Sequence, residues 1–196
     1  NIIAEIGWNH MGDVELAEKM ISRAASTGVD YCKFQTWKVK SLKSGPWDND
    51  GRLEIYKKAE LTEDKHKKLV EICKQHGIKF MTSVFNINDI DFISSLSDEI
   101  IKIPSHEVFN IDLIKKAQDR FKTVIISVGA CTWNEFKELY NKIDLKKEVF
   151  FLHCVSSYPL AAENVNMMKL NEIFKLHKKI GYSGHLSGID DAILAI

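Results

Sequence analysis

The amino-acid sequence predicts an α/β fold, a (β/α)8 TIM barrel truncated before its eighth strand. Short apolar runs typical of buried strands alternate with segments of helical periodicity along the 196 residues. The connections between them are short, which favours right-handed βαβ units and a parallel sheet. We count seven strands, each followed by a helix or the start of one. This number fits a barrel without its last strand better than a doubly wound sheet, which remains the alternative.

The first βα unit shows the pattern that the rest of the chain repeats. Residues 2–6 predict a strand, and the apolar residues of the helix that begins near Val14 recur at three- and four-residue steps. Gly28 suits the position after a helix end, and Thr132 with Glu135 forms a capping box. Further strands are predicted at 31–35, 78–84, 100–103, 123–128, 149–152 and 179–183, and further helices at 62–76, 86–96 (or from Asn88), 110–117, 132–143, 170–178 and from Asp190.

Residues 37–61 interrupt the alternation. They contain a polar segment with Pro46 and Gly51, and we expect a loop there. A loop of this length in a compact domain is usually a lid, a binding loop or a mobile segment.

The composition limits the classes of function. The formal net charge is zero, which offers no electrostatic reason to expect nucleic acid or an anionic membrane as a partner. No apolar run approaches the roughly 20 residues of a membrane-spanning helix. The start of the chain resembles no signal peptide, so we expect a cytoplasmic protein with four reduced cysteines. The chain starts within a strand and stops within a helix, and we expect it to be incomplete.

Polar side chains follow almost every predicted strand, and barrels build their sites at these carboxyl ends. Lys33 and Lys102 lie on different strands. Ser105 follows the strand of Lys102, and Ser127 and Ser183 lie at the ends of two others. Lysines supply compact charge and serines oriented donors, so together they suit an anion that carries phosphate and carboxylate. Taken singly, Lys33 fits a surface lysine and each serine fits an ordinary turn residue.

The histidines give a weaker signal. His185, which follows the last strand, is a possible metal ligand, but one histidine is not a site and a second ligand is needed. His153 lies within a strand, where we expect it to pack or to bond to backbone. We expect His66, His76 and His177, on predicted helices, to be exposed to solvent.

Six motifs resemble the sialic acid synthase family, the phosphoenolpyruvate-condensing nonulosonate synthases that include N-acetylneuraminate, legionaminate and pseudaminate synthases and a spore-coat polysaccharide relative. In order along the chain they are IIAEIGWNHMGD, VDYCKFQTW, IIKIPSHE, ISVG, FLHCVSSYP and GYSGHLSG. The resemblance covers nearly the whole chain.

The resemblance implies that residues 1–196 form a TIM-barrel catalytic domain, which the family follows with an antifreeze-like domain that this chain lacks. It implies a homodimer and a divalent metal, manganese or magnesium, whose second ligand lies outside this segment. The implied enzyme is a transferase of carbohydrate and polysaccharide biosynthesis. It condenses phosphoenolpyruvate with an amino sugar such as N-acetylmannosamine and releases phosphate.

The resemblance also assigns residues. Glu5, Lys33, Lys102 and Tyr158 are those expected to act in catalysis, the lysines on phosphoenolpyruvate and the other two facing the sugar. His185 is the metal ligand. Substrate-binding roles are implied for Gln35, Asn49, Ser105, Glu107, Ser127, Ser156 and Ser183.

The chain departs from the family pattern at several of these motifs. Met11 replaces a usual asparagine, and Ser156 replaces a frequent asparagine. TSVFN at 82–86 replaces Ser-Thr-Pro-Phe-Asp, and Gly184 stands where the family commonly has aspartate before the metal histidine.

Two other functions remain open at this level. One is a Schiff-base aldolase with Lys102 as the nucleophile, because that lysine lies in an apolar strand. The other is a degenerate barrel that binds a sugar phosphate without turnover.

Overall fold

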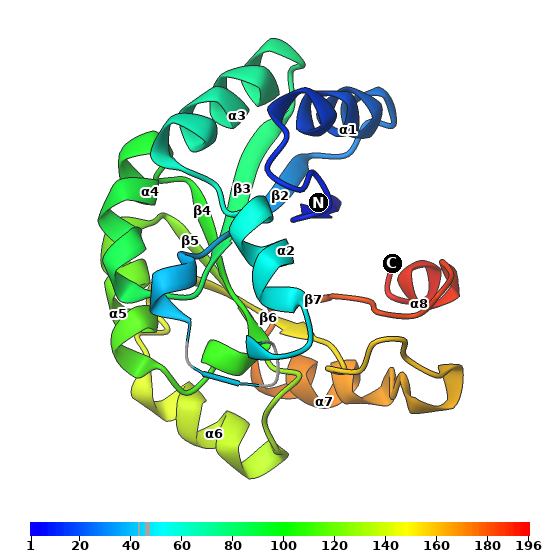
Figure 1. Ribbon diagram of the computed structural model, residues 1–196. Helices are drawn as coiled ribbons and strands as arrows, with labels where there is room; N and C mark the ends of the chain where they lie inside the picture. The colour runs from blue at the N-terminus through cyan, green and yellow to red at the C-terminus, as the bar shows by residue number, and fades with distance from the viewer. Residues whose placement is uncertain (43, 46–47) are drawn as a thin grey trace. The chain divides into compact units, whose positions relative to one another are not determined.

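The computed structural model describes residues 1–42, 44–45 and 48–196, which contain seven strands joined by helices (Figure 1). Contacts group them into two units, Asn1–Ser97 and Asp98–Ile196, which we describe one at a time. None of the helices in the described ranges is long and apolar enough to cross a membrane.

The first unit is a parallel sheet with helices on one face. Its strands are β1 (Ile3–Gly7), β2 (Tyr31–Thr36) and β3 (Lys79–Val84), paired in that order. Helices α1 (Val14–Ser26) and α3 (Glu63–Gln75) contact each other beside the sheet (Figure 1). The strands and these helices bury one core, formed by Ile6, Ala17, Ile21, Cys32, Phe34, Leu61, Leu69, Cys73, Ile78 and Phe80.

Strand β2 shows how this packing places polar groups. Cys32 and Phe34 belong to the core beside α1 and α3. Because side chains alternate along a strand, Lys33 and Gln35 lie on the opposite face of the sheet. The apolar side chains of β2 therefore pack against the helices, and its polar side chains lie on the other face of the sheet.

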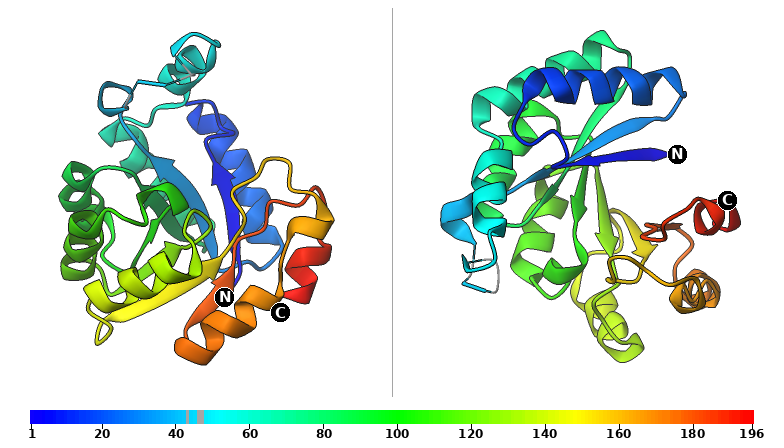
Figure 2. Two further views of the ribbon diagram at one scale, coloured as in Figure 1. Left: turned by 90° about the horizontal axis from the view of Figure 1, so that it is seen from below. Right: turned by 45° about the vertical axis from the view of Figure 1, so that its right-hand side comes forward.

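The second unit repeats the design with strands β4 (Ile100–Ile103), β5 (Thr123–Ser127), β6 (Glu148–His153) and β7 (Ile180–Tyr182), parallel and paired in that order. The helices of this unit are α5 (Ile111–Arg120), α6 (Trp133–Lys142), α7 (Met168–Leu176) and α8 (Asp190–Leu194). Phe151 of β6 packs edge-to-face on Phe136 of α6, with ring centroids 5.0 Å apart. Helix α7 contacts β6 and β7, and α8 follows β7 (Figure 2).

The predicted fold class is confirmed. Each described strand is followed by a helix, and neighbouring strands within each unit are parallel, as in the βα units of a (β/α)8 TIM barrel. The capping box of Thr132 and Glu135 is present, and Gly28 follows α1 with a φ of +78°. The four cysteines are free and buried, as expected.

The loop prediction for residues 37–61 was wrong in part. The segment contains a 3-10 turn (Val39–Ser41) and the helix α2 (Arg52–Ala59). Ala59 is the only residue of α2 that is buried, so the helix lacks the apolar stripe by which a helix is recognised in a sequence. Pro46, one of the residues behind the loop prediction, lies outside the described residues. The remaining helix, α4 (Ile90–Leu96), follows a 3-10 turn that Asn86 caps.

The turn after β1 accounts for the asparagine that the family usually has at the position of Met11. Met11 has a φ of +49°, in the left-handed region that asparagine tolerates better than methionine. The next residue, Gly12, has a φ of +76°, and a Cβ there would lie 2.1 Å from the carbonyl oxygen of Lys58 in α2. Helix α2 is thus held against the first turn by a contact that only glycine permits.

We predict that Gly12→Ala destabilises the protein by more than about 3 kcal/mol, because it adds a backbone clash to the strain of a positive φ. Gly28→Ala is the matched control. Its φ is nearly the same, +78°, but nothing lies within 4 Å of its Cβ position, so only the strain remains. Urea unfolding of both variants measures the difference. Equal losses of stability in the two variants would contradict the proposed contact.

Candidate functional site

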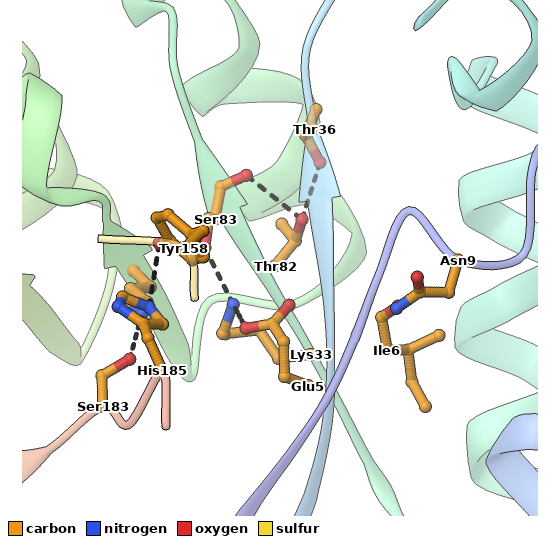
Figure 3. A network of polar contacts seen from close by, with 11 residues as sticks. Glu5, Ile6, Asn9, Lys33, Thr36, Thr82, Ser83, Tyr158, Ser183 and His185 are labelled. Carbon is orange, nitrogen blue, oxygen red and sulfur yellow. Dashed lines mark hydrogen bonds and ion pairs between the residues drawn. The ribbon is translucent and has the colours of Figure 1, made fainter. Parts of the chain in front are cut away.

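In the first unit, Lys33 lies between an acid and a hydroxyl (Figure 3). Its register partner on β1 is Glu5, with which it forms an ion pair. Its ammonium donates to Ser83 Oγ at the end of β3, at 3.2 Å. The lysine is 4% exposed, whereas the Glu5 side chain is 46% exposed. An ammonium is therefore buried at the end of the strands with an acid at the solvent side.

Burial lowers the pKa of Lys33, because low-polarity surroundings disfavour the ammonium, and the Glu5 carboxylate opposes that effect. A second anion near Lys33 would favour the charged form in the same way. The arrangement therefore suits an anionic ligand.

Three polar side chains surround the backbone at Gly7. A Cβ at this glycine would lie 3.4 Å from Glu5 Oε1, 3.9 Å from Asn9 Nδ2 and 4.0 Å from Gln35 Nε2. The Asn9 amide donates to the Ile6 carbonyl oxygen at 3.0 Å (Figure 3). The structure thus brings the predicted residues Glu5 and Gln35 to the same place beside the end of β1.

His66 is buried, so the prediction that it is exposed to solvent was wrong. Its Nδ1 donates to the Thr62 carbonyl oxygen at 2.9 Å, so Nε2 accepts from the Thr36 hydroxyl at 2.8 Å. Thr36 Oγ1 in turn lies 2.8 Å from Thr82 Oγ1 (Figure 3). Burial lowers the pKa of His66, in keeping with a neutral ring. His66 therefore joins the start of α3 to the ends of β2 and β3.

In the second unit, Lys102 repeats the position of Lys33 on its own strand. It is 8% exposed between the buried Ile101 and Ile103, and its ammonium donates to Ser183 Oγ, just beyond β7, at 3.3 Å. Its register partner on β5 is Ile125, so Ser127, two residues farther along, lies on the same face of the sheet.

Hydroxyl and thiol groups gather around Gly129. Its backbone N–H donates to Ser105 Oγ at 3.2 Å, and Ser105 Oγ lies 3.1 Å from Cys154 Sγ. A Cβ at Gly129 would lie 2.5 Å from Cys154 Sγ and 3.0 Å from Ser156 Oγ. Ser127 Oγ is buried and has no hydrogen-bond partner among the described residues. A buried hydroxyl in that state is a donor available to a ligand or a water.

His185 has the tautomer that a metal ligand binding through Nε2 requires. Its Nδ1 donates to the Val155 carbonyl oxygen at 2.6 Å, which leaves the Nε2 lone pair free of a proton. Nε2 accepts from the Tyr158 hydroxyl at 2.9 Å (Figure 3), and Tyr158 is 75% exposed. No group of three histidine, cysteine, aspartate or glutamate side chains suited to a metal occurs in the described part of the chain. These residues thus supply one candidate ligand and not a complete site.

Several other predictions can be placed. Asn49 lies in an exposed turn before α2. Glu107 accepts from the side chain of Asn110, which caps α5, at 2.9 Å, so its carboxylate serves a helix end. His153 is buried and its Nε2 donates to the Val165 carbonyl oxygen, as expected. His177 was placed wrongly on a helix surface, since it ends α7 half-buried with Nε2 bonded to the Val149 carbonyl oxygen.

Two residues of the site escaped the sequence assignment. Ser83, in the predicted strand 78–84, was given no role, although it binds Lys33. Gly129 was unremarked within its motif, although its lack of a side chain leaves room for Cys154 and Ser156. The signal for Ser83 was its place at the end of a strand beside the strand of Lys33.

Parallel βα units with polar strand ends are typical of a TIM-barrel protein that binds a ligand at these ends. Comparison with known proteins shows the family. The NeuB family matches residues 20–196, and the chain belongs to that family. N,N'-diacetyllegionaminic acid synthase from Campylobacter jejuni is 34% identical, with 100% of this chain and 63% of the relative covered. Human N-acetylneuraminate-9-phosphate synthase is 30% identical, with 100% of this chain and 58% of the relative covered.

A solved structure supports the same conclusion. The N-acetylneuraminic acid synthetase from Leptospira borgpetersenii, in complex with citrate, is 31% identical, with a TM-score of 0.91 over 98% of this chain and 67% of that one. The chain spans about 60% of the length of the curated relatives it matches. The relatives described here are thus named synthases of nonulosonic acids.

We predict that His10 makes the protein less stable in acid. Its Nδ1 accepts from the Gly12 N–H at 2.9 Å, and burial, followed by the nearby Lys65, lowers its pKa to about 4. Between pH 6.5 and pH 4 the unfolded chain therefore binds more protons than the folded one, so stability falls as the pH drops. In His10→Asn, the loss of stability between pH 7 and pH 5 should shrink by about 1–2 kcal/mol.

Urea unfolding at the two pH values measures this effect, with His76→Asn, at a half-exposed position, as the control. An unchanged pH dependence in His10→Asn would show that folding does not lower the pKa of His10.

We further predict that Gly129→Ala destabilises the protein by about 1–3 kcal/mol, because the new methyl group overpacks the space beside Cys154. Gly188→Ala is the control, since nothing lies within 4 Å of its Cβ position. Thermal and urea unfolding compare them. If Gly129→Ala were as stable as Gly188→Ala, the packing described around Cys154 would be wrong.

Proposed function

We propose that the intact protein is a nonulosonic acid synthase that condenses phosphoenolpyruvate with an N-acetylated amino sugar such as N-acetylmannosamine and releases phosphate. The names of the relatives support this proposal. A homodimer belongs to the same proposal, on the resemblance alone.

The observation that carries the proposal is a construction that occurs once in each unit. A strand lysine is buried, and its ammonium donates to a serine at a strand end: Lys33 to Ser83 and Lys102 to Ser183. A buried ammonium favours anions close to it, as the Glu5 carboxylate beside Lys33 shows. Phosphoenolpyruvate carries two anionic groups, a phosphate and a carboxylate, and either group suits the ammonium of a buried strand lysine.

The proposed reaction forms one carbon–carbon bond, and at C2 it replaces the bond to the phosphate ester oxygen with a bond to the oxygen of water. The aldehyde oxygen gains a proton and becomes a hydroxyl. C3 of phosphoenolpyruvate attacks the aldehyde carbon of the open-chain sugar, and positive charge develops at C2. Water adds at C2, and inorganic phosphate leaves with the oxygen that joined it to C2. Glu5, 46% exposed beside Lys33, stabilises this charge or accepts the proton of the water.

The other residues of the chain position the substrates. The lysines and the hydroxyls of Ser105, Ser127 and Ser183 orient phosphoenolpyruvate, an effect on proximity and not on bonding. His185, with its Nδ1 proton on Val155, would contribute one ligand to a divalent manganese or magnesium ion. Such an ion polarises an aldehyde oxygen when bound. The remaining ligands are expected from outside the described residues.

The test is phosphate release by the intact gene product from phosphoenolpyruvate, assayed with N-acetylmannosamine and related N-acetylated amino sugars and added manganese. We predict that Lys33→Met and Lys102→Met each lower kcat/KM by about 100-fold or more, because each removes a charge that binds the reacting anion. Lys122→Met is the control, since Lys122 is 61% exposed and pairs with surface acids.

Two outcomes would contradict the proposal and favour another function. A covalent adduct with Lys102, trapped by borohydride in the presence of substrate, would identify a Schiff-base aldolase. No release of phosphate with any sugar tested would favour a barrel that binds a sugar phosphate without turnover.

A further inference from the structure

Asp191 is a buried carboxylate that the proposed reaction does not use. It lies in the first turn of α8 and is 4% exposed, whereas its neighbour Asp190 is exposed. A carboxylate loses hydration on burial and persists only where hydrogen bonds replace it. The partners of Asp191 should therefore show what the residue does.

Both oxygens of this carboxylate accept hydrogen bonds. Oδ1 accepts from the Ala192 N–H at 2.8 Å, and Oδ2 accepts from the Tyr182 hydroxyl at 2.8 Å. The pKa of Tyr182 is raised by burial and then by this contact, so the phenol keeps its proton and acts as the donor. Asp191 thus ties the start of α8 to the last residue of β7.

Gly184 provides the space for this contact. A Cβ at residue 184 would lie 2.6 Å from Asp191 Oδ2 and 3.0 Å from Tyr182 Cε1. A side chain at 184 and the carboxylate of residue 191 therefore compete for one place. In this chain the carboxylate from α8 occupies it.

The segment held in this way carries two predicted site residues. The backbone of this segment, residues 183–185, also bonds to β6 and to the loop after it. The Ser183 N–H donates to the His153 carbonyl oxygen at 2.9 Å, and the Leu160 N–H donates to the His185 carbonyl oxygen at 3.3 Å. Ser183 meets Lys102, and His185 meets Tyr158. Movement of the segment would displace both side chains together.

We propose that Asp191 is a positioning residue for phosphoenolpyruvate binding: by accepting the Tyr182 hydroxyl in the space left by Gly184, it holds the end of β7 where Ser183 reaches Lys102. The inference rests on the proposed function for its catalytic consequence. Its steric part rests on the contacts of Asp191, Tyr182 and Gly184 alone.

The catalytic consequence is tested in the intact gene product by steady-state kinetics with phosphoenolpyruvate. Asp191→Ala should raise the KM for phosphoenolpyruvate by about fivefold or more, with a smaller effect on kcat, because loss of the hydrogen bond from Tyr182 misplaces Ser183. Asp191→Asn should stay within about twofold of the unmodified protein, since its amide can donate to the Tyr182 oxygen while its carbonyl oxygen keeps Ala192. Asp190→Ala is the control and should change neither constant.

An unchanged KM in Asp191→Ala would overturn the positioning role. So would an Asp191→Asn variant as impaired as Asp191→Ala, because the hydrogen bond would then not be what matters.

The steric part is tested by thermal unfolding without any substrate. Gly184→Ala should lower Tm by about 3–8 °C in the unmodified protein and by clearly less in the Asp191→Ala background, where the carboxylate is gone. Gly188→Ala, with open space at its Cβ position, should cost the same in both backgrounds. Equal effects of Gly184→Ala in both backgrounds would refute competition for one place. This measurement needs no phosphoenolpyruvate. It therefore tests the steric part of the inference even if the proposed function is wrong.

Discussion

The burial of a lysine ammonium beside a strand-end serine is the interaction on which the rest of this structure depends. Lys33 and Lys102 are both buried, and each donates to one serine hydroxyl. Because a desolvated ammonium is costly, the fold must supply compensating groups at fixed places. The parallel register supplies these groups. It pairs Glu5 of β1 with Lys33, and it places Ser83 two residues beyond Met81, the register partner of Lys33 on β3. The strand register that packs apolar side chains against the helices therefore also fixes which polar side chains meet on the other face of the sheet.

Absent side chains matter as much as present ones. At Gly12 the space is taken by a backbone carbonyl of α2, at Gly129 by the Cys154 thiol, and at Gly184 by the Asp191 carboxylate. Each glycine lies within a motif of the resemblance, so these motifs combine residues that act with residues that make room. The last case explains the departure at 184. The acid next to this strand end comes from α8 and not from the strand.

The success of prediction from the sequence differed with the kind of feature. Strands and amphipathic helices were found because their periodicity is local, and β4 was predicted with its observed bounds. Helix α2 was missed because it buries little and so carries no apolar stripe. His66 was misjudged because its neighbours on α3 are charged, while its own side chain bonds to Thr36, thirty residues away along the chain.

By itself, the sequence determined the succession of βα units, the polar character of the strand ends and the resemblance to a family of synthases, since each of these is written in local patterns of residue type. Tertiary structure alone decided which serine meets which lysine, that the Nδ1 of His185 carries its proton, and that Asp191 fills the space beside Gly184. These contacts join residues distant along the chain, and their geometry follows from strand register and packing, which local composition does not encode.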